Sequence, residues 1–129
     1  MTTPPRTTAT IWDERYRPPV YAFGTAPNAF LASQRERFLP GQRALVPGDG
    51  EGRNGVWLAS LGLEVVSVDA SSVGCEKARQ LAAERGVKID VQCADLNQWS
   101  WPVAAFDVVA AIYIHFPPDQ RTALHRRMF

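Results

Sequence analysis

The sequence has 129 residues, with 14 Lys and Arg against 13 Asp and Glu and a formal net charge of +1. This is the length of a single domain, 1–129, and the balanced charge gives no reason to expect nucleic acid or an anionic membrane as a partner. No apolar run approaches the roughly 18 residues of a membrane span, and the first residues lack the apolar core of a secretory signal. Cys75 and Cys93 do not have a metal-ligand spacing, so we expect no metal and a reducing compartment, the cytoplasm.

The first part of the chain has few signs of regular structure. Residues 1–10 are rich in Thr and Pro, and we expect them to be mobile. A short helix is predicted over 12–16, followed by a loop with several aromatic residues. A second helix is predicted over 29–38, where a Pro-Gly pair ends it.

From residue 42 onward, short apolar runs alternate with helical patterns. This alternation predicts a three-layer α/β sandwich with a Rossmann-like, doubly wound parallel sheet, and right-handed crossovers give the strand order 3-2-1-4. The strands are expected at 43–46, 64–68, 88–93 and 106–114, and the helices at 53–61, at 73–85 and from Pro117 onward.

The loop after the first predicted strand contains three glycines, and the second predicted strand ends on an acid. Gly48, Gly50 and Gly52 allow a sharp turn and a close approach of a ligand to the backbone. Asp69 can accept hydrogen bonds from the two hydroxyl groups of a ribose. Because the carboxyl ends of parallel strands lie at one edge of a sheet, the sequence predicts a nucleoside site there.

Three charged residues in and after this loop bear on which nucleoside is bound. Arg53 stands where the dinucleotide fingerprint has its third small residue, which would prevent the close helix–strand packing that the fingerprint needs. The carboxylates of Asp49 and Glu51 would repel a pyrophosphate and attract a cationic ligand. The alternative is a tight turn with a solvated acidic rim. A nicotinamide-dependent oxidoreductase remains the competing class of enzyme.

A third acid follows the third predicted strand. Asp95 could accept a hydrogen bond from the exocyclic amine of adenine, and the backbone N–H of Leu96 could donate to a ring nitrogen. Ala70, next to Asp69, is included in the same predicted site. Taken alone, Asp95 would more simply be the cap of a turn.

Together these residues resemble the class I S-adenosylmethionine-dependent methyltransferases over residues 43–116. The three glycines match the first motif of that family, Asp69 the acid after the second strand, Asp95 the acid after the third, and 106–109 the start of the fourth. The resemblance implies S-adenosylmethionine as the cofactor. One position departs from the family, which often has an acid where this chain has Val46.

The amino-terminal aromatic residues give a narrower resemblance, to the tellurite-resistance and thiopurine methyltransferase type. That resemblance implies that 11–41 is a lid segment over the α/β core, 42–129, and that the acceptor is a small molecule such as a thiol or a chalcogen compound. Methyl transfer requires alignment rather than a nucleophilic side chain, so no catalytic residue is assigned. The candidate residues of the acceptor pocket are Tyr16, Tyr21, His115 and Phe116.

The sequence ends soon after the fourth predicted strand, whereas members of that family continue for three more strands. We therefore expect the apolar fourth strand to be an exposed sheet edge, and pairing of two such edges predicts a homodimer. A cofactor-binding module without catalysis remains the alternative to a small-molecule methyltransferase.

Overall fold

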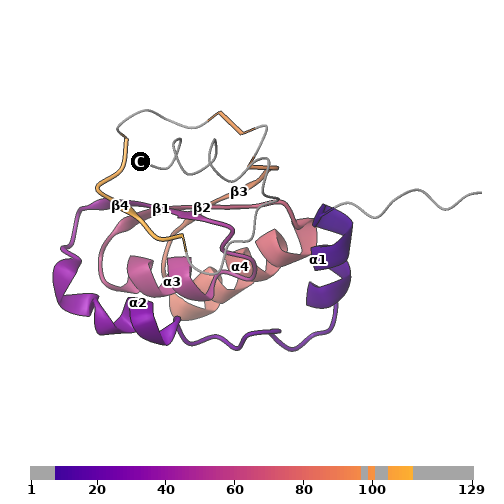
Figure 1. Cartoon of the computed structure of the whole chain (residues 1–129). Helices are drawn as coiled ribbons and strands as arrows, with labels where there is room; N and C mark the ends of the chain where they lie inside the picture. Colours follow the sequence, from indigo (N-terminus) through magenta and orange to yellow (C-terminus); the bar gives the residue numbers. More distant parts are fainter. Residues whose placement is uncertain (1–7, 97–98, 101–104, 112–129) are drawn as a thin grey trace, which may run out of the picture.

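The computed structural model describes residues 8–96, 99–100 and 105–111 (Figure 1). Its centre is a four-stranded sheet with the order β3-β2-β1-β4, in which all the neighbouring strands are parallel. The predicted α/β fold and strand order are therefore confirmed. The bounds are β1 Arg43–Pro47, β2 Glu64–Asp69, β3 Asp90–Cys93 and β4 Val108–Val109.

The register of the strands places the predicted site residues at one edge of the sheet. Pro47, the last residue of β1, is opposite Val68, and Asp69, the last residue of β2, is opposite Cys93. The loops after β1, β2 and β3 therefore leave the sheet side by side. The predicted fourth strand, 106–114, is described only to residue 111, and its remainder lies outside the described residues together with the predicted last helix.

Two helices, α3 (Arg53–Ser60) and α4 (Ser72–Arg85), lie on the same face of the sheet (Figure 1). Gly52 is the N-cap of α3 and has φ +90°, a conformation that strains any residue with a Cβ. The Ser71 hydroxyl caps α4 by accepting from Gly74 N at 3.0 Å, and Gly86 ends α4 with φ +68°. Both helices begin within one residue of their predicted starts.

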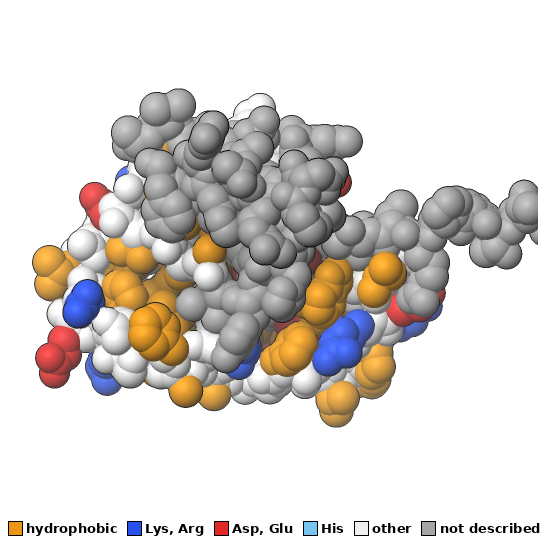
Figure 2. Space-filling view, in the orientation of Figure 1, with side chains coloured by type: hydrophobic (Ala, Val, Ile, Leu, Met, Phe, Trp, Pro, Cys, Tyr) orange, Lys and Arg blue, Asp and Glu red, His pale blue; other side chains and the backbone are white. Residues whose placement is uncertain are grey.

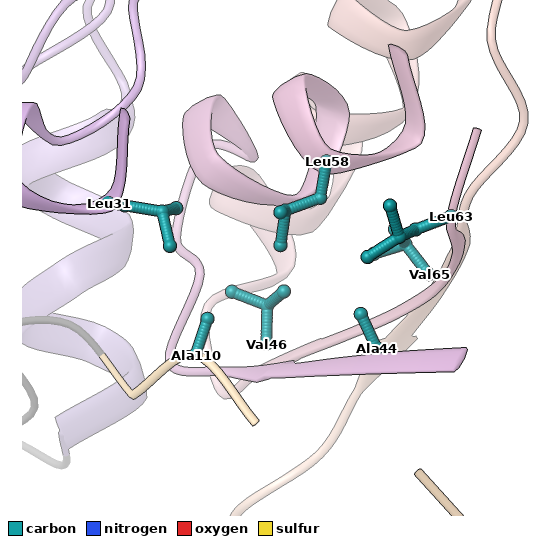
Figure 3. Packing of buried hydrophobic residues seen from close by; sticks show 7 residues of the cluster. All are labelled: Leu31, Ala44, Val46, Leu58, Leu63, Val65 and Ala110. Carbon is teal, nitrogen blue, oxygen red and sulfur yellow. The ribbon is translucent and has the colours of Figure 1, made fainter. Parts of the chain in front are cut away.

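The strands alternate their side chains between two apolar clusters. On the helical face, β1 and β2 pack against α2, α3 and β4 (Figure 3). Leu45 and Val68 instead join Leu96 in the second cluster, with Trp99 and Phe106 packed against it. The first cluster consists of Leu31, Ala44, Val46, Leu58, Leu63, Val65 and Ala110.

The amino-terminal part differs from its prediction in two places. Helix α1 runs over Thr8–Tyr16, so it begins four residues before its predicted start at residue 12. The helix predicted over 29–38 is divided into α2, Ala29–Ser33, and a 3-10 turn, η1, Arg35–Arg37. Gln34 lies between them with φ −95° and ψ 11°, outside the α-helical region. In the part of the chain that the structure describes, no helix is long and apolar enough to cross a membrane.

Candidate functional site

The glycine-rich loop after β1 turns back on itself at three residues with positive φ. These are Gly48 at +67°, Gly50 at +59° and Gly52 at +90°. Gly48 N donates to the Val68 carbonyl at 2.7 Å, which attaches the loop to β2. A Cβ on Gly50 would meet Tyr16 and one on Gly52 would meet Ala78, so glycine is needed at these two positions for packing as well as for the turn.

Asp69 lies next to this loop at the end of β2. Its Oδ1 accepts from Gly50 N at 3.1 Å and its Oδ2 accepts from Ser71 N at 3.0 Å. A carboxylate has about four lone-pair positions, so each oxygen keeps capacity for one more donor after these bonds. Burial raises the pKa of Asp69, and the two backbone hydrogen bonds oppose that rise. The carboxylate is thus held in a fixed orientation and suits a pair of ribose hydroxyls.

Asp49 has a different environment from the one that its position in the loop suggested. Only 7% of the residue is exposed. Its Oδ2 accepts from the Ser67 hydroxyl at 2.8 Å, and both of its oxygens accept from Gly55 N at 3.2 and 3.3 Å. Burial raises the pKa of Asp49 to about 7, against the effect of these hydrogen bonds. The contacts show an internal link between the loop, α3 and β2 rather than an acidic surface.

Glu51 is likewise 5% exposed and bound within the protein. Its Oε2 pairs with Lys77 Nζ of α4 at 2.8 Å, and its Oε1 accepts from Ala22 N at 2.7 Å. The negative charge is therefore matched by an internal cation. Asp49 and Glu51 therefore do not form an acidic surface that attracts a cationic ligand, and the sequence argument for one is wrong. The alternative of a solvated rim is wrong for the same reason.

The residues predicted to surround the base follow β2 and β3. The Ala70 carbonyl accepts from Cys93 Sγ at 3.7 Å, so Ala70 adjoins the end of β3. Asp95 is exposed, and its carbonyl accepts from Trp99 N at 2.9 Å in a single helical turn. Leu96 packs into the second apolar cluster, with Leu45 and Val68, on the face of the sheet opposite α3. The structure therefore brings the loops that carry Asp69 and Asp95 to the same edge of the sheet.

The side chain of Tyr16, at the end of α1, covers the glycine-rich loop. Tyr16 is 5% exposed. A Cβ on Gly50 would lie 2.5 Å from its hydroxyl oxygen, and one on Gly74 would lie 2.9 Å from its ring. Burial, and then the charge of Asp69, raise its pKa. Tyr16 is therefore adjacent to the predicted nucleoside site.

Aromatic and basic side chains continue outward from Tyr16. Trp12 stacks on Tyr16 with ring centroids 5.4 Å apart, and Phe23 lies 6.4 Å from Trp12. The guanidinium groups of Arg15 and Arg53 lie 5.0 and 5.7 Å from the Phe23 ring. Figure 2 shows hydrophobic and basic side chains next to one another at the side of the molecule where α1 lies.

Of the other three acceptor-pocket candidates, only Tyr21 is described, and it lies elsewhere. The Tyr21 hydroxyl donates to the Lys77 carbonyl at 3.2 Å, and its ring packs against a cluster that contains Val56 and Leu81. Tyr21 thus packs against α3 and α4. His115 and Phe116 lie outside the described residues.

Two residues that hold the helices around the site in place were not among the predicted site residues. Asp13 Oδ1 accepts from the Ser71 hydroxyl at 2.5 Å and from Val73 N at 3.3 Å, so α1 is attached to the amino end of α4. Asn54 Oδ1 accepts from Asn28 N at 2.8 Å and connects α3 to the start of α2. Ser71 has a detectable signal, because a serine just before a helical pattern is a common N-cap. Nothing in the sequence identifies the partners of Asp13 or Asn54.

A parallel sheet with a glycine-rich first loop and an acid after the second strand defines the Rossmann-like class of nucleoside-binding proteins. Within that class, residues 44–129 match the methyltransferase domain family, and the chain belongs to this family. The chain is 33% identical over 114 residues to ribosomal protein L11 methyltransferase of Symbiobacterium thermophilum. That match covers 82% of this chain and 38% of the relative.

Solved structures are similar over much of the chain. Magnesium protoporphyrin IX methyltransferase of Synechocystis, with bound S-adenosylmethionine, is 27% identical with a TM-score of 0.63, over 78% of this chain and 48% of that one. A structure from work on the conversion of a disulfide bond into a thioacetal group in echinomycin biosynthesis is 25% identical with a TM-score of 0.77, over 95% and 54%. The chain thus spans about half the length of these proteins, and little more than a third of the curated relative. The predicted methyltransferase family is confirmed, and one of the similar structures holds S-adenosylmethionine.

Proposed function

We propose that this chain binds S-adenosylmethionine at the edge formed by the ends of β1, β2 and β3, and that it methylates a small molecule. The observation that carries the proposal is the Asp69 carboxylate, which two backbone N–H groups orient and which keeps acceptor capacity for two hydroxyls. Membership of the methyltransferase family supports it. The same membership favours this function over a nicotinamide-dependent oxidoreductase.

Each part of the site has a separate role in this proposal. Asp69 binds the ribose, the backbone of Gly48 and Gly50 gives the cofactor a close approach, and the loop with Asp95 and Leu96 borders the adenine. S-adenosylmethionine supplies an electrophilic methyl group when it is bound. The contribution of the chain is to orient the reactants and to exclude water, which can supply much of the acceleration of a displacement reaction. Tyr16 closes the site on the side of α1.

For the acceptor we propose a thiol or chalcogen compound, as in the tellurite-resistance and thiopurine type of methyltransferase. Support comes from α1, whose aromatic side chains Trp12 and Tyr16 stack beside the glycine-rich loop. Such acceptors are nucleophilic without help from a general base. Release of labelled methyl groups to a panel of thiols, selenite and tellurite tests the acceptor class. Turnover of none of them, with intact cofactor binding, would favour a binding module.

Replacement of Asp69 tests the cofactor site. We expect Asp69→Ala to weaken the binding of S-adenosylhomocysteine by roughly 1–3 kcal/mol, about 5- to 150-fold, because the ribose loses its charged acceptor. Titration calorimetry measures the change. The matched control is Asp90→Ala, which removes an exposed carboxylate at the opposite end of β3. Equal affinities of the two variants, or binding of NAD in preference to S-adenosylhomocysteine, would refute the proposed site.

A further inference from the structure

The two cysteines of the chain lie at the same point of the fold. Cys75 is in the first turn of α4 and is buried, whereas Cys93 is the last residue of β3 and is exposed. The register pairs Cys93 with Asp69, the carboxylate of the proposed ribose site. Both thiols therefore lie next to the turn that leads from β2 into α4.

Hydrogen bonds place both thiols against the backbone at the carboxyl ends of β2 and β3. Cys75 Sγ donates to the carbonyls of Asp69 at 3.5 Å and of Gln92 at 4.0 Å. Cys93 Sγ donates to the Ala70 carbonyl at 3.7 Å. Burial, and then the nearby Cys93, raise the pKa of Cys75 to about 12. Cys75 Sγ thus contacts the backbone of both β2 and β3, and Cys93 Sγ contacts the turn that follows β2.

We propose that Cys75 and Cys93 are a reversible dithiol–disulfide pair, and that its oxidation weakens nucleoside binding at Asp69. The second half of this inference rests on the proposed function. The pairing itself does not, because it follows from the position of the two thiols. One exposed and one buried cysteine at the same turn is an arrangement in which the first can react with an oxidant and the second can resolve the product.

The oxidant is a peroxide. The Cys93 thiolate attacks one oxygen of hydrogen peroxide, the O–O bond breaks, and a sulfenic acid and one water form after proton transfer. Cys75 sulfur then attacks Cys93 sulfur, and the sulfenic oxygen leaves as a second water with the proton of Cys75. In total two thiols lose two hydrogens and two electrons, and one peroxide is reduced to two waters. Dithiothreitol reverses the reaction by thiol–disulfide exchange.

The disulfide changes the turn that orients Asp69. The carbonyls of Asp69 and Ala70 each lose an S–H donor, because a disulfide has none. Ser71, whose N–H holds the Asp69 carboxylate, directly follows Ala70 in this turn. A covalent link between α4 and β3 thus acts one or two residues from the proposed ribose acceptor. We expect the affinity for S-adenosylhomocysteine to fall about three- to tenfold on oxidation.

Mass spectrometry and calorimetry on the whole chain test both halves. After treatment with hydrogen peroxide, we expect a loss of about 2 Da, the two hydrogens of the thiols, and a peptide link between Cys75 and Cys93. The affinity for S-adenosylhomocysteine should fall and should return after dithiothreitol. Cys93→Ser, a change at an exposed residue, should bind like the reduced chain and be insensitive to peroxide in its affinity. Cys75→Ser should likewise show no loss of 2 Da.

Two results would overturn the inference. One is oxidation of Cys93 to oxygen adducts alone, with no internal link. The other is a quantitative internal disulfide that leaves the affinity for S-adenosylhomocysteine unchanged. If the reduced chain binds no S-adenosylhomocysteine at all, the proposed function fails. The mass measurement then still decides whether the pair forms.

Discussion

Asp49 shows how a buried carboxyl group makes stability depend on pH. Its pKa is about 7 in the folded chain against an ordinary 3.8, mainly because it is buried. A group with a raised pKa in the native state binds its proton more tightly there than in the unfolded chain. Its contribution to stability is therefore fully present below pH 4 and is lost as the pH rises to about 7.

Replacement of Asp49 by Asn tests this contribution. Between pH 4 and pH 7, we expect the unfolding free energy of the wild type to fall relative to that of Asp49→Asn, by on the order of a few kcal/mol. The amide has a similar shape but does not titrate. Urea unfolding at several pH values gives the difference. Asp90→Asn, a change of an exposed carboxylate, should leave the wild-type profile unaltered, and parallel profiles for Asp49→Asn would contradict the assignment.

At the scale of the elements, the contact between α1 and α4 shapes the edge of the site. Gly74 in the first turn of α4 is in contact with the Tyr16 ring, and the absence of a Cβ makes the contact possible. Asp13 adds hydrogen bonds to Ser71 and Val73 at the same end of α4. Gly74 thus allows the close approach of α1 and α4, and the hydrogen bonds of Asp13 hold the two helices together.

A double-mutant cycle tests this contact. We expect Gly74→Ala to destabilise the chain by about 1–3 kcal/mol, because the new methyl group would lie 2.9 Å from the Tyr16 ring. In a Tyr16→Ala background the same change should cost less, because only the Gly50 carbonyl, 3.1 Å from the new methyl group, then remains close and alanine is a better helix former than glycine. Urea unfolding of the four proteins gives the coupling energy. An equal cost in both backgrounds would show that Tyr16 is not the obstacle.

At the scale of the whole molecule, one lysine connects the amino-terminal segment to the α/β core. Lys77 Nζ donates to the carbonyls of Pro18 and Val20 at 2.5 and 3.0 Å while it pairs with Glu51. The Lys77 and Glu51 side chains are 11% and 4% exposed. The loop after α1, the glycine-rich loop and α4 therefore meet at one buried ion pair.

Removal of the cation should leave Glu51 buried and uncompensated. We expect Lys77→Met to cost about 3–5 kcal/mol, and addition of Glu51→Gln to restore much of this loss. Urea unfolding measures the cost, and hydrogen exchange should show faster exchange at Ala22 N, which donates to Glu51. The control is Lys88→Met, at an exposed lysine. A cost for Lys77→Met no larger than for that control would rule out a buried pair.

The sequence by itself determined the order of the strands and the edge at which the site lies. Apolar runs such as 43–46 and the glycines that follow act locally, and right-handed crossovers then leave few ways to arrange the strands. For the same reason Asp69 and the glycine-rich loop could be placed together, because both follow neighbouring parallel strands. The same rule predicts that Asp95, the acid after the third strand, lies at this edge of the sheet.

Only the tertiary structure decided where the acidic side chains of the loop and the aromatic residues of α1 lie. Asp49 and Glu51 are adjacent to flexible glycines, and their partners, Ser67 and Lys77, are 18 and 26 residues away. The Tyr16 side chain packs against Gly50 and Gly74, and nothing in the sequence relates it to these two residues. Periodicity reports which face of an element is apolar. It does not report which distant group will compensate a buried charge or leave room for a ring, and those contacts fix the electrostatics of this site.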